Sequence, residues 1–204
     1  MLNVLLLGAT GTFGSVLAKK LAEDSKCCVT LFARHVERIK ASGENVKIVC
    51  GDAANIDNLK AAVRGQDVVY SAISGSQLPQ IAKNLVSVMP ECNVNRLIFM
   101  GAVGIYNEIP VEIGGQYNVE NEPPQIPNRE AVDVIEASKL NYTILRPGFL
   151  RNGREDDFVL TLKGEYAKGY VTTIPSVLNL ALAVIHDETL YSRKSVSITQ
   201  DATK

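Results

Sequence analysis

The chain has 204 residues, of which 46% are apolar and 21% charged, and its formal net charge is -1. This composition is typical of a globular protein with a real core, and the length fits one domain. A charge so close to zero gives no reason to expect a nucleic-acid partner. No apolar run is long enough to span a bilayer, and no basic segment precedes the first one, so we expect a cytoplasmic protein without a membrane partner.

The first hundred residues alternate between apolar runs and amphipathic stretches. The expected strands are Asn3–Leu7, Cys28–Ala33, Val46–Val49, Asp67–Ile73 and Arg96–Met100. The helices expected between them are Thr12–Asp24, Val36–Ala41, Ile56–Val63 and Gln77–Met89. Near-continuous apolar strands separated by helices are typical of a parallel sheet covered on both faces. We therefore predict an α/β fold, a Rossmann-like doubly wound parallel sheet in three α/β/α layers.

The regular alternation stops after Met100. Residues 101–127 hold half of the chain's prolines and several glycines, which predicts a long loop, and such loops are usually functional. The remaining expected elements are a helix over Asn128–Ser138, a strand over Tyr142–Leu145, an irregular stretch over Phe149–Thr173, a helix over Pro175–His186 and a strand over Ser195–Thr199. We interpret residues 1–204 as a single Rossmann-like domain with two long loops, 101–127 and 149–173.

The most informative motif is the glycine-rich turn between the first expected strand and the first expected helix. Glycine permits a tight turn and a close approach of the backbone to a pyrophosphate. The N–H groups at the start of the helix have no partner within it, and the helix dipole favours negative charge there. The motif therefore predicts a dinucleotide cofactor. We interpret the single domain over residues 1–204 as an NAD(P)-binding Rossmann domain, with 101–127 and 149–173 as its substrate-side loops. The residues expected to contact it are Gly8, Thr10, Gly11, Thr12, Phe13 and Gly14.

The end of the second expected strand bears on the choice between NADP and NAD. An Asp or Glu there would bind the ribose 2′-hydroxyl of NAD, but this sequence reads Ala33-Arg34-His35. Arg34 can hold a 2′-phosphate through paired, charge-assisted hydrogen bonds, which favours NADP and keeps NAD as the alternative. Arg34 can also simply cap a surface turn, and His35 is expected at the surface.

Two further strand ends are expected to contact the cofactor. Asp52 and Ala53 follow the third strand, where the Asp52 carboxylate can accept a hydrogen bond from the adenine amino group or cap the next helix. Ser71, Ala72 and Ile73 end the fourth strand. Small residues there allow a cofactor to lie against the backbone, and packing explains them equally well.

The four cysteines do not predict a metal site. Cys27 and Cys28 are adjacent, which is not a ligand spacing, and no pair of histidines supports a zinc site. We interpret the cysteines as reduced thiols, with Cys28 and Cys50 filling the core from their strands.

Five segments resemble a known family in their order along the chain. They are GATGTFG at 8–14, LFAR at 31–34, GDA at 51–53, RLIFMGAVGIY at 96–106 and NYTILRPGFL at 141–150. They resemble the atypical short-chain dehydrogenases/reductases, and within them the compact NAD(P)-binding group with the NmrA-like and biliverdin reductase B (flavin reductase) types. The chain is also similar to proteins labelled NAD-dependent epimerase/dehydratase. The resemblance implies that Arg146, Pro147 and Gly148 lie near the nicotinamide.

The chain departs from that family at the catalytic positions. Short-chain dehydrogenases use a Ser after the fifth strand and a Tyr-x-x-x-Lys motif, but here the strand ends at Gly101-Ala102 and Asn121 stands four residues after Tyr117. Arg129 replaces a lysine that relatives often carry, and it either binds an anion or is a surface charge. Tyr106 and Tyr117 are the candidate catalytic residues, with Ser74 as a weaker third. A structural role is an equal alternative for Tyr106.

Three functions fit these observations. The first is reduction of a small organic acceptor, such as a quinone, flavin or carbonyl compound, by NADPH, because the cofactor carries the difficult chemistry. The second is a non-catalytic NADP(H) sensor of the NmrA type that acts through a protein partner. The third is a nucleotide-sugar epimerase or dehydratase, which would need the missing Tyr–Lys pair. A monomer and a homodimer are both compatible with the sequence.

Overall fold

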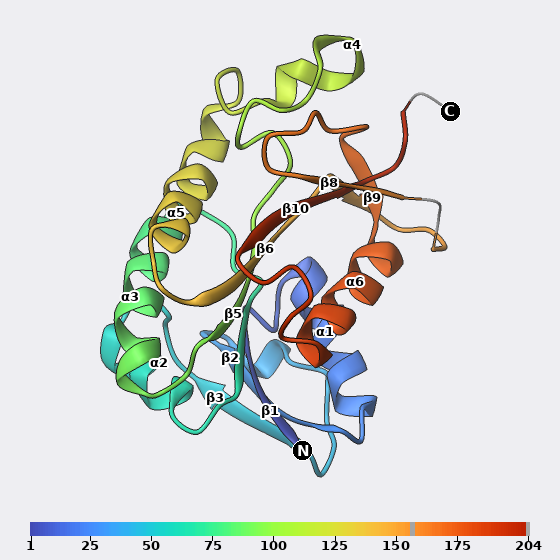
Figure 1. Cartoon of the computed structure of the whole chain (residues 1–204). Coiled ribbons are helices and arrows are strands. Elements are labelled where there is room, and N and C mark those ends of the chain that lie inside the picture. Colours follow the sequence, from blue (N-terminus) through green and yellow to red (C-terminus); the bar gives the residue numbers. More distant parts are fainter. Residues whose placement is uncertain (156–157, 203–204) are drawn as a thin grey trace.

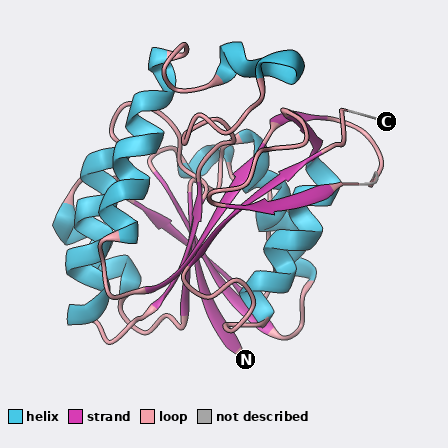
Figure 2. Cartoon of the chain, turned by 45° about the horizontal axis from the view of Figure 1, so that its top comes forward, coloured by secondary structure: helices cyan, strands magenta, loops and turns pink. Residues whose placement is uncertain are grey.

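The structure, a computed structural model, describes residues 1–155 and 158–202, and these form three layers (Figure 1). Within these residues an eight-stranded sheet has the strand order β3-β2-β1-β4-β5-β6-β10-β8. Only β8 runs antiparallel to its neighbour in this described sheet, and the other strand pairs are parallel. Helices cover both faces of the sheet (Figure 2). The predicted doubly wound, Rossmann-like α/β fold is therefore confirmed.

The described elements follow the predicted order closely in the first hundred residues. The strands are β1 Leu2–Leu7, β2 Cys27–Ala33, β3 Val46–Cys50, β4 Val68–Ser71, β5 Arg96–Met100, β6 Asn141–Pro147, β7 Phe149–Arg151, β8 Val159–Leu162, β9 Val171–Thr173 and β10 Lys194–Thr199. The helices are α1 Thr12–Glu23, α2 Ile56–Val63, α3 Leu78–Glu91, α4 Val111–Gly114, α5 Ile126–Glu136 and α6 Ile174–His186. In the described part of the chain, no helix has the length and apolarity needed to cross a membrane.

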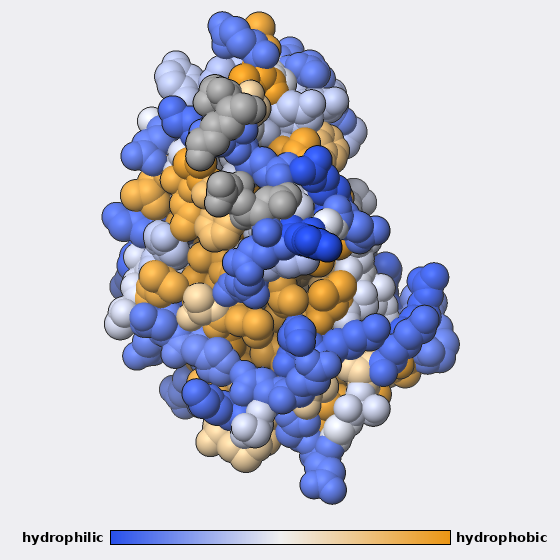
Figure 3. Space-filling view, turned by 90° about the vertical axis from the view of Figure 1, so that its right-hand side faces the viewer, coloured by the Kyte–Doolittle hydropathy of each residue, from blue (hydrophilic) through white to orange (hydrophobic). Residues whose placement is uncertain are grey.

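The central strands are apolar throughout because their successive side chains point to opposite faces of the sheet, and both faces are covered by helices. In β1, Leu5 and Leu7 pack with α2, α3 and α5, while Val4 and Leu6 pack with α1 and α6. Both faces of the sheet are thus buried, as expected for a parallel sheet between helices. Figure 3 views the side of the molecule that carries α6, where apolar surface gathers in the middle and hydrophilic residues surround it. The core cluster on this face includes the partly buried side chains of Leu160, Ile174 and Leu182.

The predicted helix over Val36–Ala41 is wrong. Only one 3₁₀ turn forms, over Val36–Arg38, and Ile39 is already extended. His35 makes no side-chain cap at its start, and none of its three residues is buried. A short helix without a buried face has little to stabilise it, so the segment follows the surface beside β2 instead.

The prediction of an irregular stretch over Phe149–Thr173 is also wrong in part. β8 adds a strand to the main sheet, with Thr161 opposite Ser197, and β7 pairs with β9 in a separate two-stranded parallel sheet. These strands have only three or four residues each, and their partners are distant in the sequence, so periodicity could not reveal them. The loop over 101–127 likewise contains α4 and 3₁₀ turns at Gly115–Tyr117 and Pro123–Gln125.

The prediction that Cys28 and Cys50 fill the core is not confirmed. Cys50 is exposed and Cys28 is half-buried, whereas Cys27, the first residue of β2, is buried. For Cys50 the reason is that β3 is the edge strand of the sheet, so no strand covers its outer side.

Candidate cofactor and substrate groove

A groove of two adjoining hollows lies at the carboxyl ends of the parallel strands. The first hollow has a volume of about 460 Å³ and extends from the glycine turn to the ends of β2 and β3. The second has a volume of about 430 Å³ and extends to the ends of β5 and β6. Gly11, Ala72, Ile73 and Ser74 line both hollows, so they join into one groove. Ligands of doubly wound folds bind at this edge.

The structure brings most of the predicted site residues to this groove. The first hollow is lined by the predicted residues Gly8, Thr10, Gly11, Arg34, Asp52, Ala53, Ala72 and Ile73. The second is lined by the predicted residues Gly11, Thr12, Phe13, Ala72, Ile73, Ser74, Tyr117, Pro147 and Gly148. Neither hollow is lined by Gly14, Ser71, Tyr106 or Arg146.

The glycine turn fits the pyrophosphate of a dinucleotide. Gly8 has a φ of 82°, a left-handed conformation that favours glycine. A Cβ atom at Gly14 would overlap the carbonyl oxygen of Gly8, so Gly14 allows α1 to start against β1. Gly11 precedes α1 without a side-chain cap. The first N–H groups of the helix are therefore available to an anion at the groove.

Two arginines line the first hollow beside the end of β2. Arg34 follows β2, and the 3₁₀ turn brings Arg38 to the same hollow beside His35. Both guanidinium groups belong to exposed residues, which is the state expected of groups that can receive a phosphate from solution. Arg34 was predicted from the sequence and Arg38 was not, although Arg38 lies only four residues after Arg34.

Asp52 shapes the loop before α2 and does not cap the helix. Its Oδ1 accepts a hydrogen bond from the N–H of Ala54 at 2.9 Å. The cap of α2 is Asn55, whose side chain accepts from the N–H groups of Asp57 and Asn58 at 3.0 Å each. The capping alternative for Asp52 is thus excluded, and Asp52 remains a residue that lines the first hollow.

Ser71 does not present its side chain to the groove. It is fully buried in β4, and its hydroxyl has no hydrogen-bond partner among the described residues. Its neighbours Ala72 and Ile73, just beyond the strand, are the residues of this segment that line both hollows. The sequence located the correct strand end but could not show which of its side chains faces the cofactor groove.

Three aromatic rings form a wall of the second hollow. The ring centroid of Tyr117 lies 4.9 Å from that of Phe149 and 4.9 Å from that of Tyr170. Met100, Val103 and Leu150 add apolar surface. Among the described residues that line this hollow, none has a charged side chain. Such a lining suits a flat, uncharged molecule.

Tyr106 lies outside the groove in a cluster of charges. Its hydroxyl is 2.9 Å from Glu136 Oε1 and 3.1 Å from Ser195 Oγ. The cationic groups of Arg129, Arg146 and Lys163 lie 4.7–4.9 Å from its ring centroid. Burial raises the pKa of the Tyr106 hydroxyl far above its ordinary value, with a smaller contribution from Glu136. These contacts connect Tyr106 of the 101–127 loop to Glu136 of α5 and Ser195 of β10, away from the groove.

Arg146 and Arg129 belong to the same cluster of charged groups around Tyr106. Arg146 is fully buried, pairs with the carboxylate of Glu108, and donates from Nε to Ser195 Oγ at 2.9 Å. Burial lowers the pKa of the Arg146 guanidinium, and Glu108 opposes this. Arg129 bonds to Asp133 and to the carbonyl oxygen of Ile105. Of the Arg146-Pro147-Gly148 segment, only Pro147 and Gly148 reach the second hollow.

Several groove residues had no clear signal in the sequence. They are Arg38 and Gln77 in the first hollow, and Met100, Gln125, Asn128, Phe149, Leu150 and Tyr170 in the second. Phe149 and Leu150 directly follow Pro147-Gly148, so their positions were the most accessible to inference. Tyr170 reaches the hollow only because β7 pairs with β9.

Comparisons with known proteins agree with this geometry. A family model described as NAD(P)H-binding matches residues 8–188. A Rossmann-fold NAD(P)-binding family protein of Shigella flexneri is 34% identical, with a TM-score of 0.85 over 99% of this chain and 95% of that chain. A wide-type short-chain dehydrogenase/reductase of Veillonella parvula, solved in complex with NADP, is 28% identical, with a TM-score of 0.86 over 99% of this chain and 96% of that chain.

A curated relative adds a second functional label. It is a protein of Bacillus subtilis (strain 168) described as an uncharacterized sugar epimerase, 25% identical over 165 residues, which are 74% of this chain and 73% of the relative. The resemblance to short-chain dehydrogenases and epimerase-like proteins is therefore confirmed. The chain belongs to the NAD(P)H-binding family, and it shares the Rossmann fold with the NAD(P)-binding protein of Shigella flexneri and the short-chain dehydrogenase/reductase of Veillonella parvula.

Proposed function

We propose that this protein is an NADPH-dependent reductase of a small, uncharged organic acceptor, such as a quinone, flavin or carbonyl compound. One observation carries the proposal: a single groove has arginines at its adenosine end and an aromatic wall at its other end. The first feature suits a phosphorylated ribose, and the second suits a flat acceptor beside the nicotinamide.

The preference for NADPH rests on Arg34 and Arg38. A guanidinium binds phosphate oxygens through two parallel hydrogen bonds, which a 2′-hydroxyl cannot match. Glu37, the acidic residue next to them, is exposed and lies 3.3 Å from His35 Nδ1. The NADP complex of the Veillonella relative supports this assignment by similarity.

Each part of the groove has a separate role in the proposed reaction. The N–H groups at the start of α1 bind the pyrophosphate, and Phe13, Pro147 and Gly148 border the nicotinamide position. A bound NADPH supplies a hydride to the acceptor. The aromatic wall excludes water and holds the acceptor flat. Tyr117, which lines the same hollow, supplies the accompanying proton from its hydroxyl to a carbonyl or quinone oxygen.

The proposal is tested by titrating the protein with NADPH, NADP, NADH and NAD, and then offering quinones, flavins and carbonyl compounds with the tightest reduced form. We expect NADPH to bind more tightly than NADH. Arg34→Ala and Arg38→Ala should each weaken NADPH binding by about tenfold, the loss of one charge-assisted contact, and leave NADH unchanged. Arg64→Ala, at the end of α2 and outside the groove, is the control. Equal loss for both nucleotides would contradict the phosphate role.

A non-catalytic NADP(H) sensor is the second candidate. It is favoured by the strand-five end, where Gly101 and Ala102 line the second hollow without a hydroxyl. It predicts tight NADPH binding without oxidation by any acceptor in the panel, together with a protein partner whose binding depends on the redox state of the cofactor. An epimerase role, suggested by the curated relative, is less well supported because no lysine lines the described second hollow. Binding of a nucleotide sugar would be needed to support the epimerase role.

A further inference from the structure

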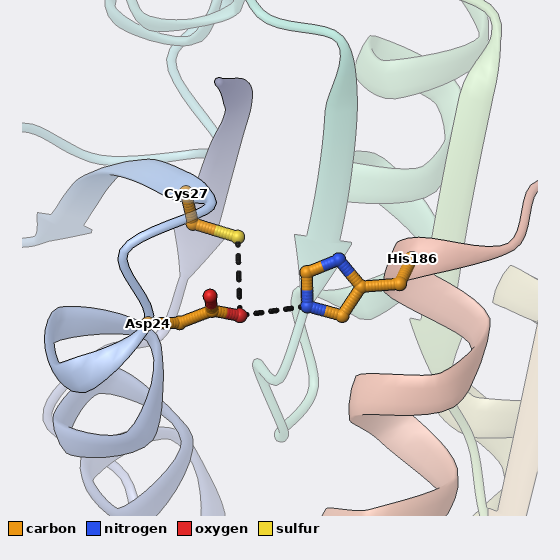
Figure 4. Close-up of side chains that lie close together, drawn as sticks. All are labelled: Asp24, Cys27 and His186. Atoms are coloured by element: carbon orange, nitrogen blue, oxygen red, sulfur yellow. Dashed lines mark hydrogen bonds and ion pairs between the residues drawn. The ribbon is translucent and has the colours of Figure 1, made fainter.

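Three side chains with metal-binding atoms meet at the edge of the sheet opposite the groove (Figure 4). Asp24 follows α1, Cys27 begins β2, and His186 ends α6. The Asp24 and His186 positions are 162 residues apart in the sequence. The spacing of cysteines and histidines therefore gave no hint of this cluster, and the sequence predicted no metal site.

The geometry of the cluster converges on one carboxylate oxygen. Asp24 Oδ2 lies 2.7 Å from His186 Nε2 and accepts a weak hydrogen bond from Cys27 Sγ at 3.7 Å. One ligand atom from each of the three side chains lies within 4.8 Å of the others. In a tetrahedral zinc site with bonds of about 2.0–2.3 Å, such atoms stand about 3–4 Å apart, so only small side-chain movements are needed.

The turn that carries Asp24 and Cys27 is held in place by its surroundings. The side-chain amide of Asn45 donates to the carbonyl oxygens of Leu21, Asp24 and Cys27 at 3.0–3.4 Å. The N–H of Lys26 donates to Asp24 Oδ1 at 2.9 Å, which orients the carboxylate and leaves Oδ2 facing the other two ligands. A site whose carboxylate is already oriented loses less conformational entropy when it binds an ion.

The cluster is also open to solvent on one side. The Asp24 and His186 side chains are 21% and 34% exposed, while Cys27 is fully buried beneath them. An ion can thus enter past the carboxylate and the imidazole and reach a thiol that the protein shields from other reagents. One coordination position remains for water.

We propose that Asp24, Cys27 and His186 form a binding site for a divalent transition-metal ion of the zinc type. Thiolate and imidazole ligands select zinc-like ions over Mg²⁺ and Ca²⁺, which prefer oxygen. Binding releases the Cys27 thiol proton to solvent, and His186 binds through Nε2 with its proton on Nδ1. The bound ion ties α1 and β2 to α6, at the opposite edge of the sheet from the groove.

Cobalt titration of the metal-depleted 204-residue chain tests the proposal, because Co²⁺ occupies zinc sites and its bond to a thiolate produces a near-ultraviolet charge-transfer band. We expect one cobalt per chain, a thiolate band, and displacement by Zn²⁺. Cys27→Ser should abolish the band. Cys28→Ser, at the neighbouring position, which faces the opposite side of the strand, should retain it.

Two further variants separate the site from folding and from adventitious binding. His186→Ala should weaken cobalt binding at least about tenfold, while His35→Ala, which changes the other histidine of the chain, should have no effect. Zinc should raise the melting temperature of the wild type and not that of His186→Ala. Absence of a thiolate band in the wild type, or a band that survives in Cys27→Ser, would overturn the proposal.

Discussion

At the scale of the residue, the groove depends on positions where a side chain is excluded. A Cβ atom at Gly14 would overlap the Gly8 carbonyl oxygen, which is backbone and cannot swing away. At Gly11, the residue before α1, a Cβ would lie 3.4 Å from the same oxygen, an ordinary contact. The two glycines of one motif therefore have different physical roles.

Gly14→Ala should lower the free energy of unfolding by about 1–3 kcal/mol, because α1 must move away from β1 to relieve the overlap. Gly11→Ala should change it much less. Urea denaturation of both variants without cofactor measures the difference. Equal stability of the two variants would show that the start of α1 adjusts freely.

The two candidate tyrosines are also distinguished at this scale. Tyr117 lines the second hollow with its ring against Phe149 and Tyr170, whereas Tyr106 has its hydroxyl in contact with Glu136 and Ser195. Only the first is placed to contact a molecule in the groove.

Tyr117→Phe should lower kcat for a carbonyl or quinone acceptor by about 100-fold, the usual effect on the rate of removing a proton donor. The Kd of NADPH should not change. Tyr170→Phe, which removes a hydroxyl from the same aromatic wall, is the matched control and should retain most activity. Steady-state kinetics and a binding titration check both values. Unchanged kcat in Tyr117→Phe would mean that the proton comes from solvent.

At the scale of the element, one buried ion pair connects the 101–127 loop to the sheet. Arg146 of β6 is fully buried and pairs with Glu108, whose side chain is 6% exposed and whose Oε2 accepts from the N–H of Tyr106. By contrast, the Arg129–Asp133 pair on α5 has side chains 37% and 49% exposed. The loss of stability when one member of an ion pair is removed is much larger for a buried pair than for an exposed one.

Glu108→Gln should destabilise the protein by about 3–5 kcal/mol, because it leaves the Arg146 charge buried without a counter-charge. Asp133→Asn should lower the free energy of unfolding by less than about 1 kcal/mol, as is usual for an exposed ion pair. The free energies come from urea unfolding curves of the two variants. Similar losses in both would mean that water reaches Arg146 when its partner is removed.

At the scale of the whole molecule, cofactor binding is coupled to folding. The groove is assembled from residues of the glycine turn, the ends of β2 to β6 and the segments over 115–117 and 149–150. The unfolded chain cannot bring these segments together, so a ligand of the groove binds only the native state and stabilises it.

NADPH at about 100 times its Kd should add about 2.7 kcal/mol to the free energy of unfolding. For a chain of this size, that corresponds to a rise in melting temperature of about 5–10 °C. NADH at the same concentration should give a smaller rise, and Arg34→Ala should reduce the NADPH rise toward the NADH value. A thermal melt monitored by circular dichroism measures these shifts, and identical shifts for NADH and NADPH would contradict the proposed cofactor preference.

Local patterns determined the first half of the molecule. The apolar runs of β1, β2, β4 and β5 predicted a parallel sheet because burial on both faces requires apolar side chains at every position. The glycine turn predicted the cofactor end of the groove because its strand, turn and helix are consecutive in the sequence. Arg34, Asp52 and Ala72 could be inferred for the same reason, since each follows a strand whose end is visible in the sequence.

Only the tertiary structure decided the features that depend on contacts between distant segments. The pairing of β7 with β9 brings Tyr170 to Phe149 and completes the aromatic wall, and no local pattern encodes that pairing. Tyr106 contacts Glu136 and Ser195 because the fold buries it. The sequence does not show which tyrosine of the loop is buried and which lines the groove. The approach of α6 to α1 likewise decided that His186 meets Asp24 and Cys27. A side chain's neighbours across the fold are set by packing, whereas its own strand or helix is set by the residues beside it.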